Sequence, residues 1–125
     1  MTADGDNDPT RPTVLIVDDH AVFRSTARAL LEFDGLDVVG EAGDAETGLS
    51  AARALDPDIV LIDVRLPGID GFAAAERLSG GPRPAVVLTS SSDDPLYPER
   101  ARRAGARGFV AKHDLSGPAL LRLLG

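Results

Sequence analysis

Short apolar runs alternate with helical patterns along almost the whole chain, and this alternation constrains the fold more than any other feature. The runs are rich in β-branched residues and nearly continuous, and they lie at Val14–Val17, Val38–Val39, Ile59–Ile62, Ala85–Leu88 and Gly108–Ala111. Runs of this kind are typical of strands that are buried on both faces. Because a helical pattern follows each run, the sequence predicts an α/β fold, a five-stranded parallel sheet with helices on both faces.

Two of the helical patterns carry local signals for where the helix begins. The fourth pattern, residues 97–104, contains Pro98, which fits the first turn of a helix but not its interior. We therefore expect a short fourth helix after a long entry loop. The fifth pattern, residues 118–124, follows Ser116, whose hydroxyl can cap the N-terminus of the helix.

Charge and composition exclude several classes of protein. The 125 residues, a length typical of one domain, include 20 acidic and 13 basic side chains, which gives a formal net charge of −7. This balance argues against direct nucleic-acid binding by the chain. The absence of cysteine excludes disulfide scaffolds, cysteine-ligated zinc and thiol catalysis. No apolar run approaches the roughly 20 residues that span a bilayer, and no signal peptide is recognisable, so we expect a cytoplasmic protein without membrane contact.

The N-terminal segment differs from the rest of the chain. Residues 1–11, with the sequence MTADGDNDPTR, contain three aspartates and no apolar periodicity. This composition is typical of disorder at a chain terminus. We expect a disordered acidic tail over residues 1–11 and a single domain over residues 12–125.

Polar residues follow four of the five predicted strands. Asp18 and Asp19 follow the first strand, Asp63 the third, Thr89 the fourth and Lys112 the fifth. The carboxyl ends of parallel strands meet at one edge of a sheet, so these side chains are expected to form one cluster. Three adjacent carboxylates repel one another unless a cation relieves them, and hard oxygen ligands without cysteine favour Mg²⁺. Lys112, the only lysine beside 12 arginines, is a point charge suited to a phosphate oxygen.

This cluster predicts phosphoryl chemistry, with Asp63 as a nucleophile that forms an aspartyl phosphate. Each residue taken alone also has a simpler interpretation. Asp19 could cap the following helix, and Asp63 could be a solvated turn residue. Thr89 is common in strands for its β propensity, and Lys112 could be a solvated charge. We interpret His20 as a helix-start residue, because a site of hard oxygen ligands does not need an imidazole.

From Thr13 to about Leu124 the chain resembles the receiver domains of two-component response regulators. The segments that carry the resemblance are VLIVDDHAVFRSTARALLE, DVVGEAGDAETGLSAARALDPDIVLIDVRLPGIDGF, VVLTSSS and GARGFVAKHDL. The VDDH opening and the VVGEA strand look most like the NarL/FixJ branch. The resemblance implies a flavodoxin-like (βα)5 receiver fold and a phosphoacceptor switch in a two-component phosphorelay.

The resemblance also implies roles for individual residues. Asp63 would accept phosphate from a sensor histidine kinase in a Mg²⁺-dependent reaction, and Lys112 would pair with the phosphoryl oxygens. Asp19, Asp63 and the backbone carbonyl of Arg65 would hold Mg²⁺ directly, whereas Asp18 would act largely through water. Such a chain is a signalling phosphoacceptor that catalyses only its own phosphotransfer and dephosphorylation, and is not otherwise an enzyme.

Further residues would transmit and time the signal. Thr89 would turn toward the phosphate, and Phe109 would repack inward behind it. Arg65 and Ser91 would tune the phosphate lifetime, although an arginine at the first of these positions departs from the commoner short polar residues. The fourth helix, fifth strand and fifth helix would form the face that contacts an output protein, which the sequence does not name. A homodimer is left open.

Two alternatives use the same residues differently. A phosphohydrolase of the haloacid-dehalogenase type also has an Asp nucleophile and Mg²⁺. The second acid of its Asp-x-Asp-x-Thr pattern is missing here, because Val64 and Arg65 follow Asp63. A degenerate receiver that is only a binding module would lack the acidic pair, the acceptor or the lysine. NarL-type regulators usually continue into a DNA-binding domain, and because this chain stops at Gly125 we expect a stand-alone receiver.

Overall fold

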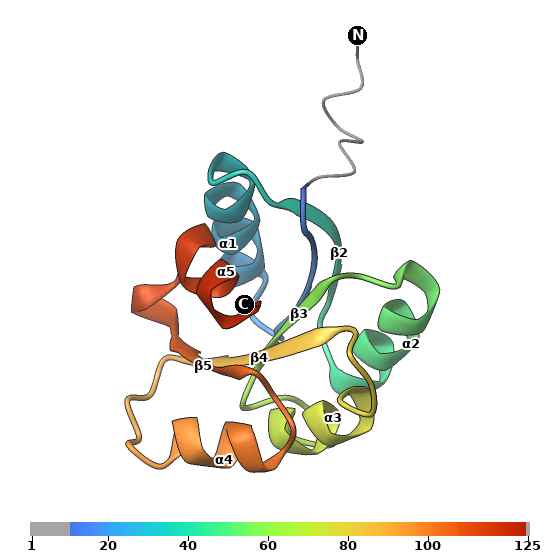
Figure 1. The fold of residues 1–125 in the computed structure, drawn as a ribbon, viewed down its shortest axis with the longest axis vertical. Coiled ribbons are helices and arrows are strands. Elements are labelled where there is room, and N and C mark those ends of the chain that lie inside the picture. The colour runs from blue at the N-terminus through green and yellow to red at the C-terminus, as the bar shows by residue number, and fades with distance from the viewer. Residues whose placement is uncertain (1–10, 125) are drawn as a thin grey trace, which may run out of the picture.

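The computed structural model describes residues 11–124, so all of the predicted acidic tail except Arg11 lies outside the described residues. Strands and helices alternate through this range (Figure 1), in the order β1 (Thr13–Val17), α1 (Ala21–Phe33), β2 (Asp37–Ala42), α2 (Ala45–Leu55), β3 (Ile59–Asp63), α3 (Gly71–Leu78), β4 (Ala85–Ser90), α4 (Tyr97–Arg103), β5 (Gly108–Ala111), the 3₁₀ turn η2 (Lys112–Asp114) and α5 (Gly117–Leu124). The strands form one parallel sheet in the order β2-β1-β3-β4-β5. The predicted five-stranded α/β fold is confirmed.

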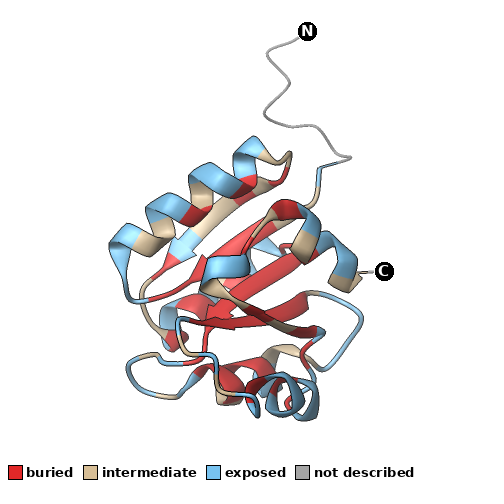
Figure 2. Cartoon of the chain, turned by 90° about the vertical axis from the view of Figure 1, so that its left-hand side faces the viewer, coloured by how far each residue is buried: buried red, intermediate tan, exposed pale blue. Residues whose placement is uncertain are grey.

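Helices cover both faces of the sheet. α1 and α5 pack on one face, and α2, α3 and α4 pack on the other. Every residue of β3 and of β4 is buried, and Figure 2 shows these strands as a continuous buried layer between partly exposed helices. Strands buried on both faces need apolar side chains at consecutive positions, which explains the nearly continuous apolar runs in the sequence.

Four strands are longer than the apolar runs that predicted them, β1 only by Thr13. β2 extends from Asp37 to Ala42 because it is an edge strand that pairs with β1 alone, which lets polar Glu41 remain exposed. β3 and β4 continue to Asp63 and Ser90, so their last residues are polar but buried. The strand ends therefore hold Asp63 and its neighbours inside the sheet rather than in loops.

Local signals at three helix ends can be compared with the structure. The alternative that Asp19 caps α1 is wrong, because His20 occupies the N-cap position. α4 has only seven residues and carries Pro98 in its first turn, as predicted. The Ser116 hydroxyl accepts a hydrogen bond from the Ala119 N–H at 3.0 Å, which confirms its capping role. The loop before α4 places Ser91 at the edge of the sheet that carries the polar strand ends.

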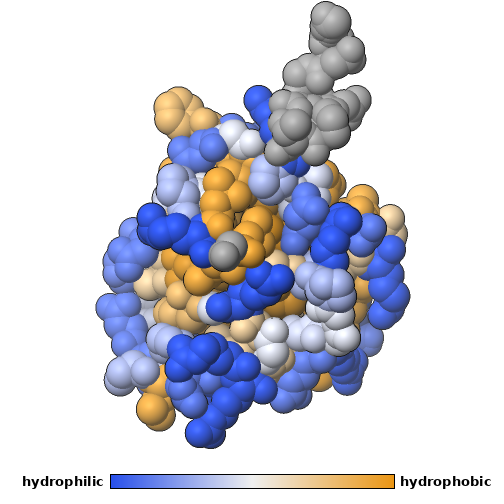
Figure 3. Space-filling model, in the orientation of Figure 1, coloured by the Kyte–Doolittle hydropathy of each residue, from blue (hydrophilic) through white to orange (hydrophobic). Residues whose placement is uncertain are grey.

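Some large apolar side chains remain on the surface beside α1 and α5. Val22 and Phe33 on α1 are 80% and 88% exposed, and Leu121 on α5 is 38% exposed. Figure 3 shows apolar residues gathered around α5 and bordered by hydrophilic ones. The oligomeric state, which the sequence leaves open, is not determined by these exposed side chains. No helix in the described range is long and apolar enough to cross a membrane.

Candidate functional site

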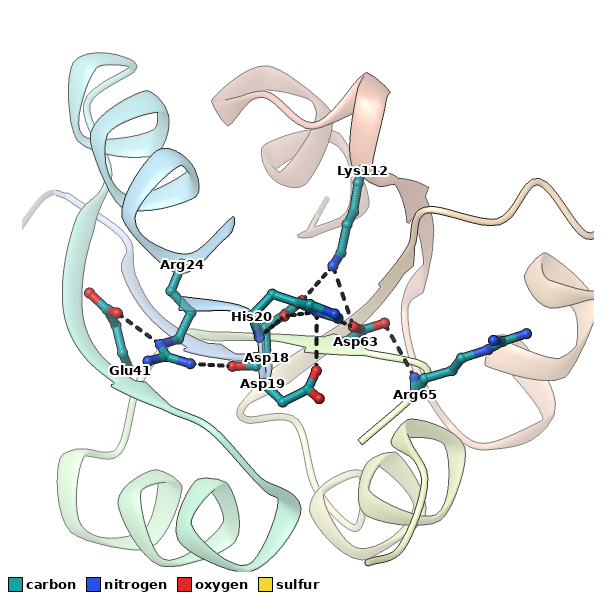
Figure 4. Close-up of polar contacts among 8 residues, drawn as sticks. All are labelled: Asp18, Asp19, His20, Arg24, Glu41, Asp63, Arg65 and Lys112. Carbon is teal, nitrogen blue, oxygen red and sulfur yellow. Dashed lines mark hydrogen bonds and ion pairs between the residues drawn. The ribbon is translucent and has the colours of Figure 1, made fainter. Parts of the chain in front are cut away.

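Three carboxylates from neighbouring strands meet at the carboxyl edge of the sheet, as the sequence predicts. Asp18 and Asp19 follow β1, and Asp63 ends β3, which pairs with β1. Together with His20, they present ligand atoms that all lie within 4.8 Å of one another. Figure 4 shows the side chains converging there, with Lys112 reaching the same point from the end of β5. Asp18 and Asp63 are buried, whereas the Asp19 side chain is 38% exposed.

Asp18 is held by hydrogen bonds to β2, to the neighbouring residue His20 and to Arg24 on α1. Its N–H donates to the Ala42 carbonyl at 2.9 Å, which continues the pairing of β1 with β2. Its Oδ1 accepts the His20 N–H at 2.8 Å, and the Arg24 guanidinium donates to its carbonyl at 2.6 Å. These contacts fix the carboxylate at the point where the chain leaves the sheet.

Asp63 is fixed by pairing with β4 and by a close approach of α3. The Val64 N–H donates to the Thr89 carbonyl at 2.9 Å, and the Gly71 N–H donates to the Val64 carbonyl at 2.8 Å. A Cβ added at Gly71 would lie 2.3 Å from the Asp63 carbonyl oxygen. Only glycine therefore lets α3 begin so close to the end of β3.

Lys112 supplies the positive charge of the site. Its Nζ lies 2.8 Å from Asp18 Oδ2, an ion pair rather than a well-directed hydrogen bond, and donates to Asp63 Oδ2 at 3.4 Å. The Nζ also lies 4.1 Å from the centroid of the Phe23 ring on α1. With only 15% of its side chain exposed, Lys112 is held between an aromatic face and two carboxylates.

The pKa values of the two buried carboxylates, Asp18 and Asp63, shift in opposite directions. Burial raises the pKa of Asp63, and the nearby charge of Asp18 raises it further. Burial alone would also raise the pKa of Asp18. Its contact with Lys112 and its hydrogen bond from the His20 N–H together outweigh that effect and lower the Asp18 pKa. As the pH falls, Asp63 is therefore expected to take up a proton before Asp18 does.

The residues predicted to respond to phosphate lie around Asp63. Thr89 is opposite Asp63 in the β3–β4 register, and within residues 11–124 its buried hydroxyl has no hydrogen-bond partner. Arg65 and Ser91 line a pocket of about 300 Å³ together with His20, Asp63, Ser90 and Ser92. The Arg65 N–H donates to Asp63 Oδ1 at 3.2 Å, while Figure 4 shows its guanidinium pointing away from the carboxylates.

Phe109 on β5 belongs to a row of aromatic side chains that continues through α4 to α3. It is half-buried, and its ring centroid lies 5.6 Å from that of Tyr97 on α4. The ring centroids of Tyr97 and of Phe72 on α3 lie 5.7 Å apart, in an edge-to-face arrangement. The Arg100 guanidinium lies over the Phe72 ring at 4.1 Å. The predicted switch aromatic is therefore packed directly against α4.

Sequence reasoning missed several residues of the site. His20 was assigned only to the helix start, which is correct, but its ring also lies over the acidic cluster. Its position directly after two aspartates was the one available signal. Arg24 and Glu41, which form an ion pair at 3.1 Å behind Asp18, and Phe23 below Lys112 gave no signal. Their roles depend on how α1 lies against the sheet.

The arrangement combines hard oxygen donors, a buried carboxylate and an ammonium group beside an open pocket. Such a site can hold a divalent cation and receive a phosphoryl group. A parallel sheet of this strand order with this site at its carboxyl edge defines the class of receiver domains.

Comparisons with known proteins identify the family. Residues 14–121 match the family described as response regulator receiver domain, so the chain belongs to that family. It is 44% identical over 102 residues to the response regulator GacA of Pseudomonas viridiflava, an alignment that covers 79% of this chain and 47% of GacA. It is 39% identical over 102 residues to BvgA of Bordetella pertussis, covering 81% of this chain and 49% of BvgA.

A solved structure supports the same assignment. The signal receiver domain of NarL from Mycobacterium tuberculosis superposes with a TM-score of 0.82 at 33% identity, covering 91% of this chain and 96% of that one. The chain spans about half the length of the curated relatives it matches. The stand-alone status expected from the sequence therefore stays a prediction.

Proposed function

We propose that this chain is a phosphoacceptor switch in which Asp63 receives a phosphoryl group from the phosphohistidine of a sensor histidine kinase. One observation supports this most directly. Asp63 is a buried carboxylate, contacted by Lys112 and faced by Asp18, that still borders an open pocket of about 300 Å³. A buried acid with this access is suited to react with a group brought in from solvent.

In the proposed transfer, an oxygen of the Asp63 carboxylate attacks phosphorus. The new O–P bond forms as the N–P bond of the phosphohistidine breaks, and the electron pair of that bond returns to the kinase imidazole. Lys112 neutralises charge on the phosphoryl oxygens, and its fixed position between Phe23 and Asp18 avoids reorganisation during transfer. The protein contributes mainly positioning and electrostatics.

The carboxylates present fit the Mg²⁺ that the family implies. Asp18, Asp19 and Asp63 supply hard oxygens within 4.8 Å of one another, and the partly exposed Asp19 is accessible to a hydrated ion. We propose that Asp19, Asp63 and the Arg65 carbonyl hold the ion directly and that Asp18 acts through water. A bound ion would neutralise the carboxylates and the incoming phosphoryl oxygens.

The proposed response begins at Thr89, whose buried hydroxyl would turn to donate to a phosphoryl oxygen. Phe109 would then repack inward and change the face formed by α4, β5 and α5, which would contact the output partner. Arg65 and Ser91 would tune the phosphate lifetime from the wall of the pocket. The likeness to the NarL receiver supports assignment to the NarL/FixJ branch. We also propose a cytoplasmic location, with residues 12–125 as the receiver domain.

The test is Mg²⁺-dependent labelling by acetyl phosphate, followed as a mass increase of the intact protein. Wild type should gain one phosphoryl group, and Asp63→Asn should gain none. Asp93→Asn removes an exposed carboxylate outside the cluster and should label like wild type. Lys112→Arg should label poorly, because a forked guanidinium replaces a slender ammonium.

Two results would contradict the proposal. Retained labelling in Asp63→Asn would exclude Asp63 as the acceptor. Release of many phosphates per chain from a phosphomonoester, lost in the same variant, would instead favour the phosphohydrolase alternative.

A further inference from the structure

The His20 side chain lies across the acidic cluster. Its Nδ1 is 3.0 Å from Asp18 Oδ1, 3.1 Å from Asp19 Oδ1 and 3.8 Å from Asp63 Oδ2. Figure 4 shows the imidazole among the three carboxylates rather than turned toward solvent, although 65% of the side chain is exposed. One ring nitrogen therefore faces every carboxylate of the proposed Mg²⁺ site.

The backbone explains why the imidazole reaches this position. His20 is the N-cap residue of α1, with extended backbone angles of φ −98° and ψ 106°, and in the described part of the chain its side chain makes no capping hydrogen bond. Its N–H donates to Asp18 Oδ1 at 2.8 Å, which ties the residue to the cluster. The ring is held at the site with Nδ1 at hydrogen-bond distance from Asp18 Oδ1, 3.0 Å, so a metal ion bound to Nδ1 would take the place of the proton between these two atoms.

The distances match those between ligands of one metal ion. Metal–oxygen bonds of 2.0–2.1 Å place neighbouring ligand atoms of an octahedral ion about 3 Å apart and opposite ones about 4 Å apart. Of the two carboxylates proposed as direct ligands, Asp19 has its Oδ1 3.1 Å from Nδ1, close to the first value, and Asp63 has its Oδ2 at 3.8 Å, between the two values. An ion bound by the carboxylates would have Nδ1 within reach without a change of fold.

An imidazole changes which ions such a site prefers. Mg²⁺ binds hard oxygens, whereas imidazole suits first-row transition metals, whose affinities rise from Mn²⁺ through Co²⁺. We propose that His20 Nδ1 is an additional metal ligand and a specificity-determining residue that makes this site prefer Mn²⁺ and Co²⁺ over Mg²⁺. This inference rests on the metal site of the proposed function.

The experiment compares metal affinities in the absence of any phosphodonor. Free Mn²⁺ is measured by electron paramagnetic resonance, and Co²⁺ and Mg²⁺ binding by calorimetry, in wild type and in His20→Ala and His20→Asn. Asn keeps a polar group near the position of Nδ1 but offers no imidazole. The matched control is His113→Ala, which removes the other imidazole, 60% exposed and close to Asp93 and Asp114.

We expect both His20 variants to lose roughly tenfold or more in affinity for Mn²⁺ and Co²⁺, with a much smaller change for Mg²⁺. His113→Ala should resemble wild type. Pulsed resonance of bound Mn²⁺ should show coupling to a ¹⁴N nucleus in wild type and none in His20→Ala.

Other outcomes would overturn the inference. Equal changes in affinity for all three ions, or no ¹⁴N coupling in wild type, would show that His20 only donates a hydrogen bond to the carboxylates. Asp19→Asn separates this failure from failure of the site itself. Suppose that Asp19→Asn loses affinity for Mn²⁺ and Mg²⁺ alike, while the His20 variants change the affinity for every ion equally. The proposed metal site is then supported, and the proposed role of His20 is wrong. If it binds both ions normally, the proposed site is wrong.

Discussion

The two helical layers that flank the sheet differ in the size of their buried side chains. In the layer under α1 and α5, which we call the aliphatic layer, Leu31, Leu36 and Leu120 are fully buried, and Ala27 is the only alanine among its twelve buried residues in the described range. In the layer under α2, α3 and α4, the alanine-rich layer, eight of the seventeen buried residues are alanine. Its largest buried side chains are Phe72 and Tyr97.

We expect the aliphatic layer to contribute more to stability and the alanine-rich layer to contain the proposed switch. Leucines contribute much apolar area, so the aliphatic layer is expected to supply most of the burial energy per residue. Alanines bring helix backbones close to the sheet and leave little side chain to rearrange. Phe109, the proposed switch residue, packs against the aromatic residues of the alanine-rich layer. Mutations in the two layers should therefore have different consequences.

The largest effect is expected from truncation in the aliphatic layer. Leu120→Ala removes a side chain that is 0% exposed and should lower the free energy of unfolding by about 2–5 kcal/mol, measured by urea denaturation. The adjacent Leu121→Ala, at 38% exposure, is the control and should cost clearly less. Equal losses would contradict a tightly packed aliphatic layer.

The alanine-rich layer should instead resist enlargement. Ala52 on α2 is 6% exposed, and Ala52→Leu should cost about 1–3 kcal/mol of unfolding free energy because the helix is forced away from the sheet. Ala54→Leu on the exposed side of the same helix controls for helix propensity and should change stability by less than about 0.5 kcal/mol. Similar values for both variants would mean that this layer has spare volume.

The aromatic contact between Tyr97 and Phe109 should be measurable as a coupling. A double-mutant cycle of Tyr97→Leu and Phe109→Leu, with the free energy of unfolding measured by urea denaturation, should give a coupling energy of about 0.5–1.5 kcal/mol. The reason is that the two ring centroids lie 5.6 Å apart. With acetyl phosphate and Mg²⁺ present, the coupling should fall as Phe109 moves inward. A cycle of Tyr97→Leu with Phe33→Leu, which is 88% exposed on α1, should show no coupling. Unchanged coupling after phosphorylation would argue against movement of Phe109.

Sequence patterns predicted the features that topology determines and missed those that depend on helix placement. The apolar runs located all five strands, and parallel pairing then placed Asp18, Asp63 and Lys112 at one edge. The full length of β2 could not be predicted, because an edge strand tolerates polar residues such as Glu41. The position of the His20 ring depends on how α1 lies against the sheet, which no spacing in the sequence encodes.

The smallest predicted effect concerns the ion pairs at the edge of the aliphatic layer. Glu41 on β2 accepts hydrogen bonds from Arg28 at 2.7 Å and Arg24 at 3.1 Å, both on α1. The hydrogen bond from Arg28, aided by Arg24, lowers the pKa of Glu41 despite partial burial. A carboxylate with a lowered folded pKa stabilises the protein above its ordinary value near 4.5, and this contribution is lost as the pH falls through the lowered pKa.

Glu41→Gln should therefore cost less than about 1 kcal/mol at neutral pH, since the side chain is 29% exposed and its pairs are screened by solvent. The difference from wild type should shrink as the pH falls through the acidic range, as measured by denaturation at several pH values. Glu76→Gln, at an exposed position on α3, is the control and should show no such trend. A difference that stayed constant with pH would mean that Glu41 acts by packing and not by charge. A difference as large as that of Leu120→Ala would mean that ionic contacts at its edge, rather than buried leucines, hold the aliphatic layer together.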